Sequence, residues 1–433
     1  MSDNVYYLHG RPREIAQFTR VGFSEHRRIE YLLSTGKMPV SRFVIEAANF
    51  DGQSSLIHTL RDENAEIVID TNVAELSVKG RFSGAVRAAP WAAEGRPLEP
   101  EDFVPGTNRG VIESIADFAV EKKVSTVMAA AHYLGDEQFG WFEIDRRACV
   151  ALRQSLDHDG GTDIAIDYPL IITYAQFRDS DIRKRLIDGL RDLPFDYLWL
   201  RISGFGADAT GVRVERYIKG LFEFHALGRP IIADQVGGLA SLAVCAFGAA
   251  SGFAHGISGK ERFLATGWVN PSNSGGRRGK TVYIPGLDRR LKVAEVRKMF
   301  DEARTSRVIF GCSDSACCGD IDRMLSNPEA HLMVQKGRQV RDLSRAPETA
   351  RADRFLTEHV EQARRRSERA MRLKKTDDEI KAKISRARER LIRFEETLIN
   401  LTEQLGPTDF ASESRVRPCH QNKGPLGGGR KNA

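Results

Sequence analysis

Short apolar runs alternate with amphipathic stretches through most of the chain. We interpret eight of these runs as strands, because they are apolar and are spaced too far apart to form hairpins. Between most of them apolar residues recur three and four positions apart, as in Gly110–Lys123 and Ile182–Leu193, which predicts helices. The eight predicted strands are Arg42–Ala47, Glu66–Ile69, Val124–Ala130, Asp163–Thr173, Tyr197–Ile202, Pro230–Ala233, Ser251–Ala254 and Arg307–Phe310.

This alternation predicts an α/β protein with a parallel sheet. A closed TIM-type (β/α)8 barrel is our first choice, and an open doubly wound sheet is the second. No GxGxxG sequence follows the first predicted strand, which disfavours a dinucleotide-binding form of the open sheet.

The pattern divides the chain into four parts. Residues 1–40 are predicted to be a helical lead-in, because Glu25–Leu33 has apolar positions at helical spacing and Gly36 ends the run. Residues 41–345 would form the barrel and residues 346–406 a C-terminal helical hairpin. The basic, glycine-containing tail at 407–433 is expected to be disordered.

Two insertions interrupt the barrel pattern. Val73–Asn108 is rich in Gly, Pro and Ala and is predicted to form a lid or loop over the barrel mouth. Leu264–Leu291, after the seventh predicted strand, contains the basic glycine-rich stretch SNSGGRRGK. Its Arg277, Arg278 and Lys280 are candidates for phosphate contacts, since glycines let backbone amides approach anions closely. A solvated loop explains the same residues equally well.

The C-terminal hairpin is predicted from an apolar seam. Its residues are spaced four and three apart, as in a coiled coil, and the seam at 380–405 would pair with a second copy of the chain or with a partner protein. Thr376 and Glu379 would form a capping box that starts the second helix. The first arm, Arg351–Lys375, is basic and either faces solvent or contacts nucleic acid. The seam consists of Ile380, Ile384, Ala387, Leu391, Phe394, Leu398, Leu401 and Leu405.

Composition narrows the class of protein. Of 433 residues, 41% are hydrophobic and 29% charged, and no run reaches the roughly 18 apolar residues of a membrane span. The N-terminus lacks the pattern of a secretory signal, and six scattered cysteines do not suggest a disulfide framework, so we expect a cytoplasmic protein. The net charge of +6 is compatible with a polyanionic partner such as tRNA or DNA.

Three cysteines and one histidine suggest a metal site. Cys312, Cys317 and Cys318 follow the last predicted strand, and His331 lies downstream. Three thiolates and one imidazole are a donor set for a closed, structural zinc site. The alternative is that these cysteines are small buried packing residues.

Polar residues gather at the ends of the predicted strands, where a closed barrel would bring them to one mouth. Asp70 and Asp234 would divide the roles of nucleophile and acid/base, provided that their environments separate their pKa values. A structural salt bridge is the alternative for each residue. The full set is Asp70, His132, Tyr174, Arg201, Asp234, Gln235, His255 and Asp314.

Several of these features resemble one enzyme family over roughly Arg42–Val334. Gly237-Gly238-Leu239 after a late strand, the basic loop Gly275–Lys280, and the cysteine cluster followed by His331-Leu332 are similar to the tRNA-guanine transglycosylases and their relatives that insert deazaguanines into DNA. The resemblance implies exchange of a base in a nucleic acid, with an aspartate nucleophile, a second aspartate as acid/base and a structural zinc. We therefore assign substrate binding to Gln235, Gly237, Gly238, His255, Arg277, Arg278 and Lys280.

The sequence also departs from that family. IDTNVAE, containing Asp70, stands where the family has a DSGG-type motif, Gly256-Ile257-Ser258 replaces a GID-like strand end, and the CxCxxC spacing is absent. A catalytically degenerate barrel that acts as a scaffold through its C-terminal hairpin is the second hypothesis.

Overall fold

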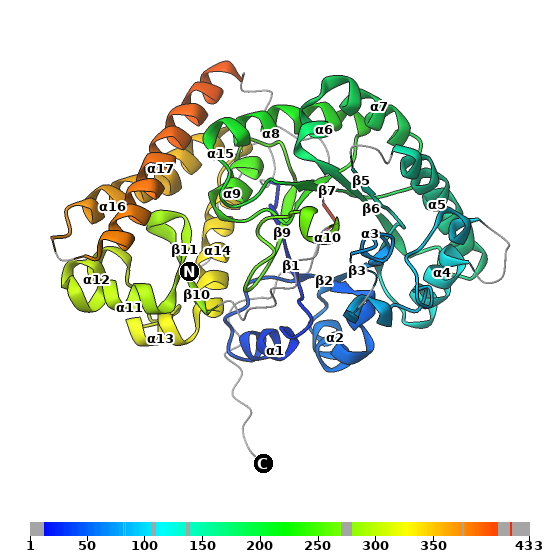
Figure 1. Ribbon diagram of the computed structural model, residues 1–433, viewed down its shortest axis with the longest axis horizontal. Helices are drawn as coiled ribbons and strands as arrows, with labels where there is room; N and C mark the ends of the chain where they lie inside the picture. The colour runs from blue at the N-terminus through cyan, green and yellow to red at the C-terminus, as the bar shows by residue number, and fades with distance from the viewer. Residues whose placement is uncertain are drawn as a thin grey trace, which may run out of the picture.

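The computed structural model describes residues 13–80, 82, 84–104, 110–135, 139–269, 279–374, 376–405 and 416–417. A central barrel of strands is surrounded by helices, and a group of smaller elements with the C-terminal helices lies beside it (Figure 1).

Eight parallel strands close into the barrel. Each pairs with two neighbours, and the ring is completed where β1 pairs with β9 and β4 pairs with β6. The (β/α)8 prediction is confirmed. The strands are β1 (Ala16–Arg20), β2 (Arg42–Glu46), β3 (Glu66–Asp70), β4 (Thr126–Met128), β6 (Ala165–Thr173), β7 (Leu198–Ser203), β8 (Ile231–Asp234) and β9 (Gly252–Gly256); the two-residue β5 (Tyr133–Leu134) adds to the end of β6.

The first and last predicted strands need correction. Residues 1–40 are not only a helical lead-in, because Ala16–Arg20 is the first barrel strand. Arg307–Phe310 is not a strand but the end of helix α12, where Val308 is 85% exposed. The insertion placed after the seventh strand therefore follows the eighth.

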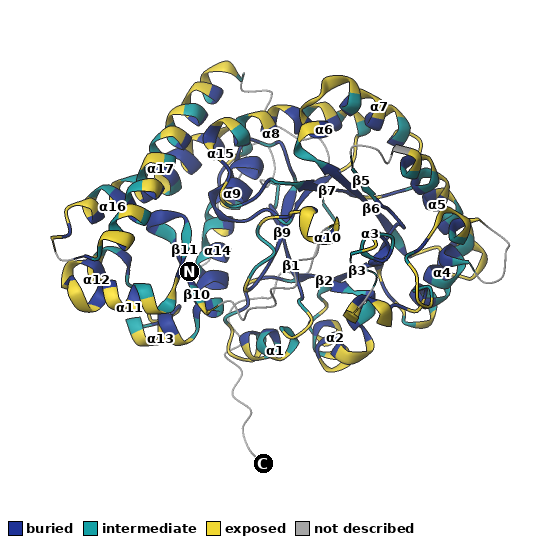
Figure 2. Cartoon of the chain, viewed as in Figure 1, coloured by how far each residue is buried: buried dark blue, intermediate teal, exposed yellow. Residues whose placement is uncertain are grey.

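Helices cover the outside of the barrel (Figure 2), and their apolar faces share one core with the outward-facing strand residues. α1 agrees with the helix predicted near residue 25. Short helices α3 (Val73–Leu76) and α10 (Thr266–Val269) and turns η1 (Ala47–Asn49), η2 (Asp51–Gln53), η3 (Gly84–Ala88), η4 (Pro100–Phe103) and η5 (His225–Leu227) lie in the connections. The covering helices are α1 (His26–Ser34), α2 (Ser54–Asp62), α4 (Val111–Glu121), α5 (Phe139–His158), α6 (Tyr174–Arg178), α7 (Ser180–Leu190), α8 (Gly211–Phe224), α9 (Gly238–Ala246) and α14 (Pro328–Arg345).

The lumen of the barrel is packed rather than open. Every second strand residue points inward, since successive side chains of a strand alternate between its faces. The inward residues form a separate apolar cluster of Ala16, Phe18, Val44, Val68, Met128, Tyr197, Trp199, Ile232 and Ala254. Polar chemistry is thereby confined to the two ends of the barrel.

A smaller unit follows β9 and has its own apolar core. An antiparallel hairpin and three helices build it, and α14 then returns to the barrel. Its elements are β10 (Thr281–Ile284), η6 (Pro285–Leu287), β11 (Arg289–Lys292), α11 (Val293–Glu302), α12 (Arg304–Phe310) and α13 (Ile321–Ser326).

The C-terminal helical hairpin is present. It runs through η7 (Glu348–Ala350), α15 (Arg351–Phe355), the π-helical turn η8 (Leu356–Glu361) and α16 (Gln362–Met371) to α17 (Asp378–Gln404). The N-cap of α17 is Asp377, whose side chain accepts from the Glu379 amide, and not Thr376 as predicted.

The apolar seam of α17 is already covered by its own chain. Residues from Ile380 to Leu401 along the seam are at most 3% exposed, and α17 packs against α8 and α16. The predicted pairing with a second copy or a partner protein through this seam therefore loses its basis. The tail beyond it lies outside the described residues except for Val416 and Arg417.

Candidate functional site

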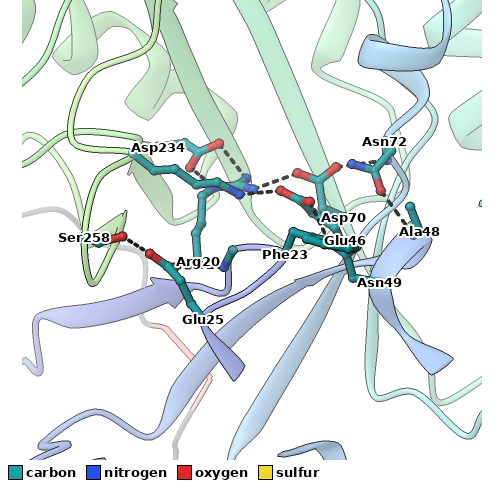
Figure 3. A network of polar contacts seen from close by, with 12 residues as sticks. Arg20, Phe23, Glu25, Glu46, Ala48, Asn49, Asp70, Asn72, Asp234 and Ser258 are labelled. Atoms are coloured by element: carbon teal, nitrogen blue, oxygen red, sulfur yellow. Dashed lines mark hydrogen bonds and ion pairs between the residues drawn. The ribbon is translucent and has the colours of Figure 1, made fainter. Parts of the chain in front are cut away.

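Four charged side chains meet at the carboxyl end of the barrel, and Figure 3 shows three of them, Arg20, Asp70 and Asp234. Arg20, Asp70 and Asp234 are the last residues of β1, β3 and β8, and Arg201 lies in β7. Each follows a lumen residue by two positions, so each points inward above the apolar cluster. We call these four residues the mouth network.

The two arginines bridge the two aspartates. Arg20 donates from Nε and Nη2 to both oxygens of Asp234, at 2.6 and 2.7 Å, and from Nη1 to Asp70 Oδ2 at 2.7 Å. Arg201 donates from Nε to Asp234 Oδ2 at 2.7 Å and from Nη2 to Asp70 Oδ2 at 3.0 Å. Asp70 Oδ1 accepts the backbone N–H of Asn72 at 3.1 Å.

The two carboxylates differ in access. The side chain of Asp234 is fully buried, whereas that of Asp70 is 12% exposed. Burial opposes the charge of both groups, but Arg20 and Arg201 outweigh it and hold the pKa of Asp70 and of Asp234 below the usual range. Both are therefore ionised near neutral pH, and their pKa values move in the same direction instead of separating.

Further charged pairs surround the mouth network. Glu46, at the end of β2, is ion-paired with Lys260 and accepts from the Asn49 side-chain amide. Glu25 accepts from the Ser258 hydroxyl and from the Gly22 amide. Figure 3 shows Glu25, Glu46, Asn49 and Ser258 around the network, so the rim of the mouth is polar.

An aromatic cluster lies on one side of the network. The Phe263 ring centroid is 5.9 Å from Arg201 Cζ, 4.7 Å from the Trp268 ring and 6.4 Å from the Tyr133 ring. The segment after β9 brings it there, because the Ala265 amide donates to the Ser203 hydroxyl at the end of β7. Planar apolar surfaces thus adjoin the charged groups.

The insertion after β3 is attached to this end of the barrel. Trp91 is 5% exposed, and its indole N–H donates to the backbone oxygen of Thr71 at 2.8 Å, directly after Asp70. The described part of the insertion therefore begins at the mouth, as a lid would.

His132 and Asp145 form a buried pair after β4. His132 Nδ1 lies 2.5 Å from Asp145 Oδ1, and its ring stacks on Trp141 with centroids 3.8 Å apart. His132 Nε2 is buried and has no hydrogen-bond partner among the residues that the structure describes.

The Gly237-Gly238 turn serves packing at the start of α9. A Cβ on Gly237 would lie 2.5 Å from the Glu261 side chain, and Gly238 has a φ of +62° with Asp288 Oδ1 only 2.9 Å from such a Cβ. The buried Lys336 donates to the Gly238 oxygen at 2.8 Å. These contacts explain the glycines without a substrate.

Other predicted residues lie away from the mouth network. His255 is on the outer side of β9, next to Phe253, and burial lowers its pKa to about 4. Tyr174 is covered by the Arg213 guanidinium at 4.2 Å. Asp314 is ion-paired with Arg338 in the smaller unit.

Two further candidates for substrate binding, Gln235 and Lys280, lie among the described residues. Gln235, after β8, is half-buried with a φ of 56°. Lys280 is exposed and donates to the Ser326 oxygen at 3.4 Å. Arg277 and Arg278 lie outside the described residues.

The four predicted metal ligands come together. Cys312, Cys317, Cys318 and His331 are buried, and their ligand atoms lie within 4.8 Å of one another, so this group can hold a metal ion. The turn that carries the two adjacent cysteines is held by the amides of Cys317 and Cys318, which both donate to the Asp314 oxygen. The group lies between α12 and α14 in the smaller unit, not at the end of a barrel strand.

Arg20 is the site residue that the sequence reasoning missed. The residues that point inward, Ala16, Phe18 and Arg20, alternate with the polar Gln17 and Thr19. This alternation with a period of two is the signal of a strand that the sequence offered. Strand β1 has only five residues, two of them polar and one charged, and it does not stand out as an apolar run.

Comparisons with known proteins add no function. No family model and no curated protein matches the sequence. A solved structure of a type I 3-dehydroquinate dehydratase from Clostridium difficile is similar with a TM-score of 0.34 and 9% identity, over 61% of this chain and 92% of that one. Among the described helices, none has the length and apolarity needed to cross a membrane.

Proposed function

We propose that this barrel is a transglycosylase-like enzyme that exchanges or modifies a nucleobase in tRNA or DNA, with Asp70 as the nucleophile. The observation that carries the proposal is the state of Asp70, which is an ionised and partly exposed carboxylate at the carboxyl end of a closed barrel. Ionised carboxylates are the groups that form glycosyl-enzyme intermediates.

In this mechanism Asp70 Oδ1 is the attacking atom, because Oδ2 is held by both arginines while Oδ1 accepts a single backbone N–H. Its bond to C1′ of the sugar forms as the C1′–N bond breaks, and the electron pair leaves with the base, which takes a proton from solvent. The incoming base loses a proton and reverses the step, which restores the carboxylate next to Arg20 and Arg201.

Asp234 has a positioning role in this proposal. Both of its oxygens accept from arginines and none of its side chain is exposed, so it orients the guanidiniums that hold Asp70. Of the nearby rings Phe263 and Trp268 are buried, and the half-buried Tyr133 is the ring that supports a planar aromatic substrate, since bases stack on aromatic rings.

Basic residues outside the mouth support a polyanionic substrate. On α16, Arg364 and Arg365 are ion-paired with glutamates of the same region. Arg366, Arg369 and Arg372 are exposed. In the basic arm, Arg366, Arg369 and Arg372 are therefore the better candidates for phosphate contacts, because Arg364 and Arg365 are already paired with glutamates.

We further propose that the cysteine group holds a structural zinc. The Cys317–Cys318 Sγ separation is 3.6 Å, and His331 Nδ1 lies 3.5 and 3.4 Å from these sulfurs. Zinc bonds of about 2.3 Å to sulfur and about 2.0–2.1 Å to nitrogen would place tetrahedral ligands about 3.8 and about 3.6 Å apart. Three thiolates and an imidazole complete that coordination, so the ion would stabilise the fold and would not meet the substrate.

A degenerate barrel is the second candidate. The observation that favours it is the balance of the mouth network, in which two arginines and two aspartates neutralise one another and Asp234 is enclosed. Its proposed scaffold surface, the α17 seam, is buried within the chain.

Incorporation of labelled guanine or a 7-deazaguanine base into tRNA and into duplex DNA tests the proposal. Asp70→Asn should reduce incorporation at least about 10³-fold and abolish a protein–nucleic acid adduct on a denaturing gel. Glu223→Gln is the matched control, because it removes another arginine-bound carboxylate, paired with Arg183 on the outer helices. Equal incorporation by wild type and Asp70→Asn would contradict the role of Asp70 as the nucleophile. No incorporation by folded wild-type protein on either substrate would favour the degenerate barrel.

A further inference from the structure

Two residues of the C-terminal tail lie inside the opposite end of the barrel. Val416 packs against the apolar cluster of the lumen, and Arg417 contacts residues at the amino ends of the strands. These residues are Arg42 and Glu66, which begin β2 and β3, Asp167 of β6, and Tyr197 just before β7. We call them the N-terminal mouth site.

Arg417 is bound through Nε, Nη2, the face of its guanidinium and its backbone, whereas Nη1 is buried without a hydrogen-bond partner among the described residues. Nε donates to Glu66 Oε1 at 3.0 Å, and Nη2 lies 3.1 Å from both oxygens of Asp167. The guanidinium carbon lies 3.8 Å from the Tyr197 ring centroid. Its backbone N–H donates to the Tyr197 hydroxyl, and its carbonyl accepts from Arg42 Nη2 at 2.8 Å.

Without Arg417 the carboxyl groups of this site would have too few hydrogen-bond donors. Arg42 is shared by Glu66 and Glu14, at 2.9 and 2.8 Å, and the fully buried Asp167 accepts from the Trp199 indole at 2.8 Å. Burial raises the pKa of Asp167 to about 7, although Arg417 acts in the opposite direction. Without Arg417, the carboxyl groups of Glu14, Glu66 and Asp167 would have one guanidinium, that of Arg42, among the described residues.

The shape of the site selects a guanidinium over an ammonium. A planar group can stack on Tyr197 while donating in its own plane to two carboxylates, whereas an ammonium is a compact point charge that cannot do both. The preference for a planar donor therefore arises from Tyr197, Glu66 and Asp167, and any guanidinium of suitable size should satisfy it.

We propose that the N-terminal mouth is a guanidinium-binding site whose resident ligand is Arg417 of the chain's own C-terminal segment. Val416 and Arg417 thereby occupy the amino end of the barrel, with Val416 as the apolar anchor. This inference is independent of the proposed base exchange, which concerns the other end of the barrel.

Chemical rescue of the full-length Arg417→Ala variant tests the site. Its apparent unfolding midpoint should fall by about 3–8 °C, because Asp167 and Glu66 lose their partner, while Arg430→Ala, which removes the same charge from the same tail, should leave it unchanged. Low-millimolar ethylguanidinium should restore the midpoint of Arg417→Ala and n-propylammonium should not. The double variant Asp167→Asn/Arg417→Ala should gain nothing from ethylguanidinium.

Limited trypsin digestion supplies a measurement that does not depend on thermal unfolding. Cleavage after Arg415, next to the anchored residues, is compared with cleavage after Lys423 in the same chain. The ratio should rise at least about tenfold in Arg417→Ala, since docking protects the backbone. The proposal is overturned if this ratio is unchanged, if Arg417→Ala melts like Arg430→Ala, or if propylammonium rescues equally well.

Discussion

A buried guanidinium needs acceptors for its donors, and the mouth network supplies them to Arg20 and Arg201 from two aspartates. The sequence placed Asp70 and Asp234 at strand ends, and their convergence follows from a closed barrel. Their pairing with arginines was not predictable, because pairing depends on which strands are neighbours. Salt bridges were the alternative stated for these residues, and the structure contains them.

Removing one member of the network should be costly. Asp234→Asn should lower the free energy of unfolding by about 3–5 kcal/mol, since two buried guanidiniums would share one carboxylate. Urea unfolding measures this loss. Asp301→Asn is the control, because Asp301 is in an exposed pair with Arg307.

The same network predicts a specific response to acid. The pKa values of Asp70 and Asp234 are lower in the folded state than the unfolded value of about 3.9. Their contribution to stability is therefore full above about pH 5 and is lost as the pH falls below about 4. The difference in unfolding free energy between wild type and Asp234→Asn should therefore become smaller as the pH is lowered from about 5 to below about 4. A difference that stays constant with pH would contradict the ion-paired network.

At the scale of elements, the spacing of apolar residues identified most strands and helices. It did not identify which elements pack against one another. The period of α17 located its apolar face correctly, yet a helical repeat does not reveal what covers that face, and the cover is α8 and α16. β1 was missed because its inward side chain at the mouth is an arginine. α12 was read as a strand because RVIF has β-branched residues, although Val308 faces solvent.

Truncation of the α17 seam distinguishes an internal from an external role. Leu391→Ala should destabilise the protein by about 2–5 kcal/mol through a core cavity, without changing the molar mass measured by light scattering. Ile399→Ala, at a 43% exposed position of the same helix, should change stability by less than about 1 kcal/mol. Dissociation of an oligomer by Leu391→Ala would instead support a partner along the seam.

At the scale of the whole molecule, the barrel and the smaller unit have separate apolar cores. The sequence identified the four metal-ligand candidates by residue type, but it attached them to a strand that does not exist. His331 lies beside the cysteines because α14 packs against them as it returns to the barrel. The spacing of the four ligands along the sequence does not predict this course of the chain.

Elemental analysis and thermal unfolding test the zinc. Wild-type protein should contain about one equivalent of zinc, and Cys317→Ser should contain under about half and unfold at lower temperature, because binding energy of a structural metal is folding energy. Cys149→Ser is the control, since Cys149 is a buried free cysteine in α5 outside the group. Equal zinc in both variants would leave the four residues as packing groups.

The closure of the barrel between β1 and β9 also sets the order of events on the ribosome. Ala16 pairs with Gly252, so β1 is synthesised long before β9, which is one of its two neighbours in the barrel. At about 5–20 residues per second, β1 waits on the order of ten to fifty seconds for β9. During that time the nascent sheet has an unpaired edge beside β1, which is the stage at which a chaperone would be needed to prevent association between chains.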